Sequence, residues 1–157
     1  MGAIGAIEAS ALGQAMRGSE WLFPAVKLLH MAGITILLGS IALLDLRLLG
    51  FRRAVPVRRL AARVLPWTAA SFLLIVPSGL AMFTADAAAL IASPVFATKV
   101  SLILAAGANA AVFHAGAFRS VARWDVEVAP PPAARAAGAL SLALWLSVIT
   151  CGVLLAA

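Results

Sequence analysis

Four long apolar runs, separated by short polar stretches, dominate the pattern of residues along this chain. A helix needs about 20 apolar residues to cross the hydrocarbon core of a bilayer, and each run approaches or exceeds that length. The sequence therefore predicts an all-α fold, an integral membrane four-helix bundle that forms one domain over residues 21–157. The expected spans are, approximately, residues 21–44, 64–83, 94–118 and 136–156.

Local helix signals agree with this division. Ser93 is a helix N-cap residue, and Pro94 follows it at the first helical position. Pro77 lies inside the second run, where a proline should kink the helix. Three consecutive prolines at 130–132 prevent a helix between the third and fourth runs.

Residues 1–20 form a separate N-terminal segment ahead of the first span. They lack the basic start of a secretory signal peptide, and Glu8, Ser10 and Gln14 interrupt their apolar residues. We expect a short amphipathic helix that lies on the membrane surface, with Ser10 or Ser19 as its N-cap.

The composition excludes an ordinary soluble protein. Of the 157 residues, 64% are hydrophobic and only 11% are charged, whereas soluble domains carry about 25% charged residues. The net charge of +6 is concentrated between the apolar runs. A nucleic-acid-binding protein would instead show a continuous basic face, so we expect no nucleic-acid partner. The single cysteine, Cys151, allows no intramolecular disulfide.

The positions of the arginines predict the orientation in the membrane. Nine of the twelve basic residues lie in or beside the first and third connections, and the second connection has none before Lys99. Positive loops stay in the cytoplasm, which places both termini outside. The nine residues are Arg47, Arg52, Arg53, Arg58, Arg59, Arg63, Arg119, Arg123 and Arg135.

The third span is rich in small residues between Ala105 and Ala111. Small residues let membrane helices approach closely, and Asn109 is able to hydrogen-bond to a neighbouring helix. This predicts a central place for the third span, although an alanine-rich composition explains the same residues equally well.

The two histidines, His30 and His114, both lie inside apolar runs. Ionisable groups in a membrane usually face the bundle interior and mark a functional site. With a rise of about 1.5 Å per residue, His30 lies roughly 13 Å below the outer boundary and His114 roughly 30 Å below it. A vertical separation of roughly 15 Å disfavours one upright haem held between them, unless the haem lies flat or one span shifts.

A second group of residues matches His30 in depth. Lys99 lies roughly 8 Å below the outer boundary, and Lys27 precedes His30 by three residues on nearly the same helix face. An imidazole is a ligand for haem iron, and cations pair with haem propionates. The plainer alternatives are a structural His30, lysines that reach the outer headgroups, and an interfacial His114. We expect Asp45 and Arg47 to anchor the first loop.

Several short motifs are spread over almost the whole chain. They are Trp-Leu-Phe-Pro at 21–24, Asp-Leu-Arg-Leu-Leu-Gly at 45–50, Leu-Pro-Trp at 65–67, and Phe-His at 113–114. On these motifs the chain resembles an uncharacterised family of small bacterial four-helix membrane proteins, which implies a fold but no activity. A bacterial protein with this orientation is expected in the inner membrane, with periplasmic termini. Members of that family carry an acidic residue where this chain has Lys27.

The order of functional residues is also similar to two further families. A histidine in span one, a basic first loop and a lysine early in span three resemble the membrane protoporphyrinogen oxidases of bacteria and the copper-resistance D type proteins. The oxidase resemblance implies haem b binding at His30 and Lys99. It does not imply the oxidase reaction, because the chain lacks the polar, aromatic-rich final loop of that family.

The leading hypothesis is therefore a b-type haem membrane protein, acting in electron transfer or as a small redox subunit. His30 would be an axial ligand, Lys99 and Lys27 would contact the propionates, and His114 is a candidate second metal ligand, with Met31 and Met82 as weaker ones. If the protein is catalytic, we expect a quinone- or porphyrin-like substrate. The alternatives are an accessory subunit of a larger membrane complex, a homodimer that encloses the cofactor, and a metal transporter.

Overall fold

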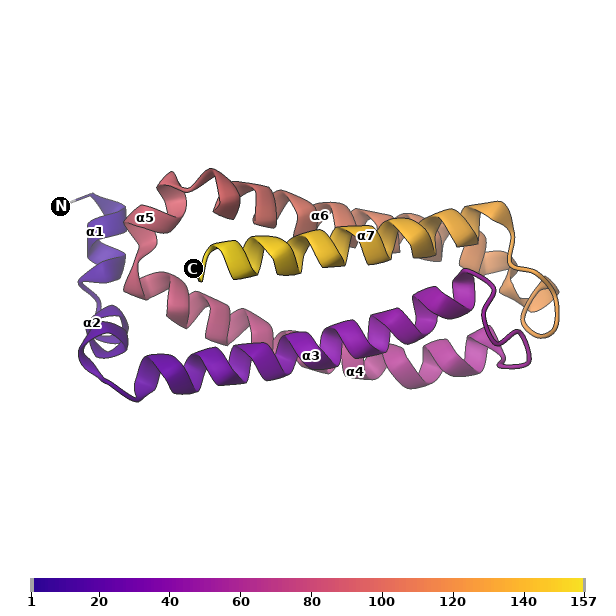
Figure 1. Cartoon of the computed structure of the whole chain (residues 1–157), viewed down its shortest axis with the longest axis horizontal. Coiled ribbons are helices and arrows are strands. Elements are labelled where there is room, and N and C mark those ends of the chain that lie inside the picture. The colour runs from indigo at the N-terminus through magenta and orange to yellow at the C-terminus, as the bar shows by residue number, and fades with distance from the viewer. Residues whose placement is uncertain (1, 157) are drawn as a thin grey trace.

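The computed structural model describes residues 2–156, which fold into helices joined by short loops (Figure 1). Four of the helices are long and apolar enough to cross a membrane, which confirms the predicted four-helix membrane architecture. The chain is accordingly a multi-pass membrane protein. These helices are α3 (Leu22–Leu48), α4 (Val57–Ala85), α6 (Pro94–Ala115) and α7 (Pro132–Leu154).

Three of the helices continue past the predicted spans at the end of the bundle that carries the arginines. Helix α3 continues to Leu48, and α4 starts at Val57 instead of residue 64. Arginine is a good helix former, so a helix does not stop where its apolar window stops. The third span is shorter than predicted, because α6 ends at Ala115 and the chain continues as the 3-10 helix η1 (Ala117–Arg123).

The four long helices form two pairs, α3 with α4 and α6 with α7, and α3 also packs against α7. No Cα atom of α6 lies within 8 Å of a Cα atom of α3 or α4. The prediction that the third span is central is therefore wrong, and α3 occupies that position. The small residues of α6 are mostly exposed. The predicted hydrogen bond of Asn109 does form, because its Nδ2 donates to the Ala137 carbonyl of α7 at 2.9 Å.

The N-terminal segment forms two short helices, α1 (Ala3–Glu8) and α2 (Ala11–Gly18), where one was predicted. They gather with α5 (Ala87–Ala92) at one end of the bundle (Figure 1). Ser10 caps α2 by accepting from the Gly13 amide at 3.2 Å, as predicted. Arg17 ties α2 to the end of α4, since its guanidinium donates to the Ala85 carbonyl at 3.0 Å.

Two of the predictions concern helix positions at prolines. The Ser93 hydroxyl accepts from the Phe96 amide at 3.4 Å, which confirms the N-cap of α6. Helix α4 continues through both Pro66 and Pro77 without ending. The hydroxyl of Ser78 donates to the Leu74 carbonyl beside Pro77.

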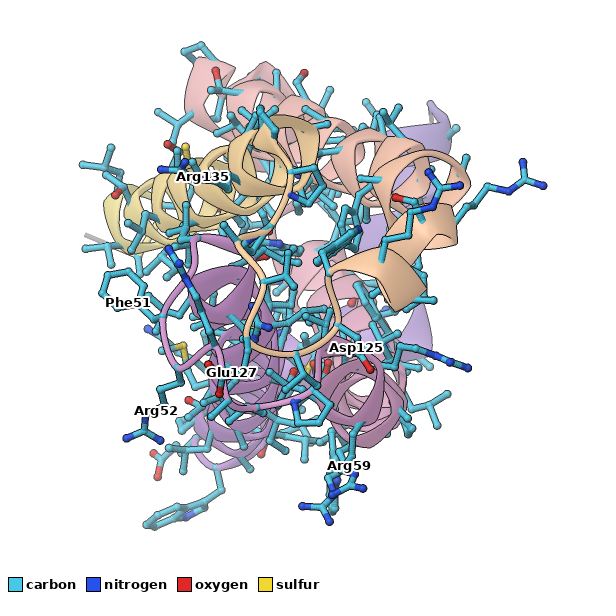
Figure 2. All side chains as sticks on the ribbon, turned by 90° about the vertical axis from the view of Figure 1, so that its right-hand side faces the viewer. Phe51, Arg52, Arg59, Asp125, Glu127 and Arg135 are labelled. Carbon is cyan, nitrogen blue, oxygen red and sulfur yellow. The ribbon has the colours of Figure 1, made fainter. Side chains whose placement is uncertain are left out.

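The opposite end of the bundle, called the arginine end here, consists of the loops 49–56 and 116–131 with the helix ends that they join. Arg47 is only 2% exposed, and its guanidinium donates to the carbonyls of Val55 at 2.7 Å and Asp125 at 3.0 Å. One buried side chain thus joins both loops, as predicted for Arg47. By contrast, Arg52 and Arg59 point away from the bundle (Figure 2).

Candidate functional site

His30 faces α4 in the half of the bundle that lies toward α1 and α2. Its Nδ1 lies 2.9 Å from the Ser78 hydroxyl oxygen and 3.2 Å from the Ile75 carbonyl oxygen. A carbonyl oxygen only accepts, so Nδ1 must carry the proton that it donates. In the neutral ring, Nε2 then keeps its lone pair and is free to bind an electrophile or a metal.

Two glycines allow this close approach of α3 and α4. A Cβ atom on Gly79 would lie 3.2 Å from His30 Cε1, and one on Gly33 would lie 2.8 Å from Ile75 Cγ1. The imidazole therefore packs against the backbone of α4. Its position depends on residue 79 being a glycine, which has no side chain to occupy that space.

Lys99 of α6 is half-buried and points toward α7. A Cβ atom on Gly152 would lie 3.7 Å from Lys99 Nζ, so the ammonium lies over the backbone of α7. Its charge acts on His30, and the ionisable group that acts on Lys99 is Cys151. Among the residues described, no carboxylate acts on the Lys99 ammonium. Lys99 and His30 therefore lie within electrostatic range of each other, on two helices whose Cα atoms do not come within 8 Å.

Lys27 is exposed on α3, three residues before His30, whereas His114 lies elsewhere. His30 precedes the end of α3 by eighteen residues, whereas His114 precedes the end of α6 by one. The two helices end at the same end of the bundle, which separates the histidines by about 25 Å along it. This separation is larger than the separation of roughly 15 Å predicted from the sequence. His30 and His114 therefore belong to two different sites.

His114 lies in a second site, a cavity of about 350 Å³ near the arginine end, called the inner cavity here. All four long helices contribute to its walls, which are mostly apolar. Its polar lining residues are Asp45, Thr68, Asn109, His114 and Ser141.

Asp45 is the unusual member of the inner cavity. It is only 5% exposed, and its Oδ2 is buried without a hydrogen-bond partner. Ser141 of α7 lines the same cavity. We predicted that Asp45 would anchor the loop together with Arg47, and for Asp45 this is wrong. The predicted span ends one residue earlier, at residue 44, which places Asp45 in the loop.

Two further polar groups of the inner cavity have a free acceptor. His114 Nδ1 lies 2.8 Å from the Ala110 carbonyl oxygen, so Nδ1 carries the proton and Nε2 keeps a lone pair. The Nδ2 of Asn109 donates to Ala137, which leaves the side-chain oxygen as an acceptor. Gly138 brings α7 against this region, because its Cβ would lie 3.0 Å from the Asp45 carbonyl oxygen.

Residues 2–156 contain no group of three or more His, Cys, Asp and Glu side chains that is arranged to hold a metal ion. The molecule therefore offers two separate sites, His30 with Lys99 and the inner cavity with Asp45. In comparisons with known proteins, no protein-family profile, curated protein or solved structure matches this chain, so its function is argued from this geometry.

Proposed function

We propose that this chain is a b-type haem-binding protein of the bacterial inner membrane, in which Nε2 of His30 is an axial ligand of the iron. The observation that carries the proposal is the pair of contacts that Nδ1 makes with Ile75 and Ser78. Metal-binding histidines usually donate the other ring N–H to a carbonyl or a carboxylate, which fixes the tautomer and the ring orientation. His30 has this arrangement before any metal binds.

Lys99 supports the same proposal. A cation inside a membrane span is costly unless it finds a partner. No carboxylate of the described residues acts on Lys99, and the propionates of haem are anions that form strong, charge-assisted hydrogen bonds with an ammonium. Lys27, exposed three residues before His30, adds a second cation for a propionate or a lipid phosphate.

The residues of the chain would contribute by holding and orienting the haem. Haem, when bound, supplies one-electron transfer. Ser78 and Ile75 hold the His30 ring in one orientation, and Gly79 leaves room for it. His114 lies too far along the bundle to hold the same haem as His30. Electron transfer is the function that this set of residues favours.

The orientation that we propose follows from the arginines. All nine loop arginines belong to the arginine end, which the positive-inside rule assigns to the cytoplasm. Both termini, His30 and Lys99 then belong to the periplasmic half.

The visible spectrum tests this proposal. The protein is purified in mild detergent from cells supplied with a haem precursor, and spectra are recorded before and after dithionite reduction. We expect a Soret band, with α and β bands on reduction, in the wild type and in His114→Ala, and their loss in His30→Ala. A colourless wild-type protein, or the same haem content in His30→Ala, contradicts the proposal. A colourless protein that copurifies with a larger complex would instead support the accessory-subunit hypothesis.

A further inference from the structure

The inner cavity contains a buried hydrogen-bond acceptor that no donor of the described residues reaches. The Asp45 carboxylate has one oxygen without any partner, and His114 Nε2 and the Asn109 side-chain oxygen are free to accept. The hydroxyl of Thr68 already donates to the Val64 carbonyl at 3.1 Å. A buried acceptor without a donor is costly, so a complementary occupant is one that donates hydrogen bonds.

The walls of the cavity restrict the size and polarity of the rest of the occupant. Most lining side chains are aliphatic or aromatic, and the volume of about 350 Å³ lies in the range of small-molecule sites, roughly 300–1,000 Å³. Such walls favour an apolar body about the size of a substituted ring. The apolar residues include Ile41, Leu44, Phe72, Ile103, Phe113 and Trp145.

The side between α4 and α6 provides the way in. Both helices line the cavity, but no Cα atom of one lies within 8 Å of a Cα atom of the other. Phe72 of α4 and Gly107 of α6 line the cavity and are exposed, so the lining reaches the surface that faces lipid. A molecule dissolved in the bilayer is able to enter here without crossing the loops.

Charge decides between the two kinds of donor. A carboxylate is able to accept from an ammonium or from a hydroxyl group. The cavity adjoins the arginine end. That end carries nine arginines, whereas its loops carry only two acidic residues, Asp125 and Glu127. This positive field opposes a cationic ligand and leaves a neutral one unaffected.

We propose that the inner cavity binds a neutral aromatic molecule with a hydroxyl donor, a phenol or hydroquinone, which enters from the bilayer and donates to Asp45. His114 and Asn109 are the acceptors for a second hydroxyl. This site is separate from the haem site proposed at His30, and neither proposal requires the other.

Binding of para-fluorophenol tests the proposal, with para-fluoroanisole as the comparison. The two molecules share the ring, and the anisole lacks the hydroxyl donor. Fluorine NMR of the protein in lipid nanodiscs reports binding whether or not haem is present, and empty nanodiscs correct for partitioning into lipid. We expect the phenol to bind at least about tenfold more tightly than the anisole, as for a hydrogen bond to a charged acceptor.

Two variants locate the binding. Asp45→Leu should reduce the preference for the phenol to less than about threefold, since the charged acceptor is gone. The matched control is Asp86→Asn, which removes an exposed carboxylate at the opposite end and should leave the preference unchanged. Equal binding of phenol and anisole by the wild type, or an undiminished preference in folded Asp45→Leu, overturns the proposal.

A third variant covers the case in which Asp45→Leu fails to fold. Gly107 lines the cavity, and a Cβ atom there would meet nothing within 4 Å, so Gly107→Leu adds side-chain volume at the cavity wall. We expect this variant to fold and to lose phenol binding. Gly39 also has nothing within 4 Å of its Cβ position and does not line the cavity, so Gly39→Leu is the matched control. Unchanged phenol binding by Gly107→Leu contradicts the proposed location.

Discussion

Gly79 of α4 and His30 of α3 pack so closely that a methyl group on the glycine would lie 3.2 Å from the imidazole Cε1. The ring packs on one helix, against the Gly79 backbone and with its Nδ1 at the acceptors of Ser78 and Ile75. The orientation of the proposed iron ligand is thus a property of the contact between two helices.

Substitution of the glycine tests that dependence. Gly79→Val places branched carbon atoms where the ring lies, so His30 must move and lose its contacts with Ser78 and Ile75. We expect a loss of most haem absorbance from a protein that still folds. Gly39→Val is the control, because a side chain there meets nothing, and it should retain its haem. If Gly79→Val keeps the wild-type spectrum, the glycine does not position the ligand.

Ser78→Ala separates ligand positioning from stability. It removes one acceptor of His30 Nδ1, and loss of such a supporting contact weakens metal binding about 10- to 100-fold. The control is Ser71→Ala on the same helix, where an equally buried hydroxyl donates to Thr68 and does not touch His30. Each variant should lose about 1 kcal/mol of unfolding free energy. Only Ser78→Ala should release haem faster to apomyoglobin, and equal release rates would argue against the positioning role.

Arg47→Ala should destabilise the whole arginine end. The guanidinium is the donor to the carbonyls of Val55, Arg53 and Asp125, and its removal leaves these groups without that partner. We expect a loss of about 3 kcal/mol or more, from the cost of unsatisfied buried polar groups. Unfolding by SDS in mixed micelles measures it. The exposed Arg59→Ala should change the unfolding free energy by less than about 0.5 kcal/mol. Similar values for both variants would contradict the role of Arg47.

Gly138 sets the distance between α3 and α7. A Cβ atom there would lie 3.0 Å from the Asp45 carbonyl oxygen and 3.1 Å from Leu48 Cβ. We expect Gly138→Ala to cost about 1–3 kcal/mol through overpacking, measured by the same SDS unfolding. Gly39→Ala should instead be neutral or stabilising by up to about 1 kcal/mol, because alanine favours a helix. A stabilised Gly138→Ala would show that the two helices are not in close contact.

The proposed orientation is open to a labelling experiment. Cys151 is the single cysteine and is buried, so Cys151→Ala provides a background without cysteine. Glu20→Cys and Ala54→Cys then place one exposed thiol at each end. A membrane-impermeant maleimide should label the first in intact spheroplasts and the second only after lysis. The reverse pattern would invert the topology.

The helices were predictable because long apolar runs and local caps determine them. Ser10 and Ser93 act within their own segments, and the sequence shows both. The peripheral place of α6 was not predictable, since its small residues suit close packing whether or not a second helix is present. The pairing of His30 with Ser78 joins residues 48 positions apart along the chain, which no local pattern indicates.

The role of Asp45 was missed for a related reason. Its neighbour Arg47 binds the loops and Asp45 faces the inner cavity, although the two residues are only two positions apart. On a helix, residues two positions apart do not share a face. Their closeness along the chain suggests one anchor, whereas the cavity that Asp45 shares with Asn109 and His114 of α6 places it in a different site.

The separation of α4 from α6 has one more consequence. Because the cavity lining between these two helices is exposed, we expect acyl chains of the surrounding lipid to complete its wall. Acyl-chain length and saturation then become determinants of what the cavity holds, in the way that a side chain would be. The same polypeptide would then select different ligands in the membranes of cells grown at different temperatures, without any change of sequence.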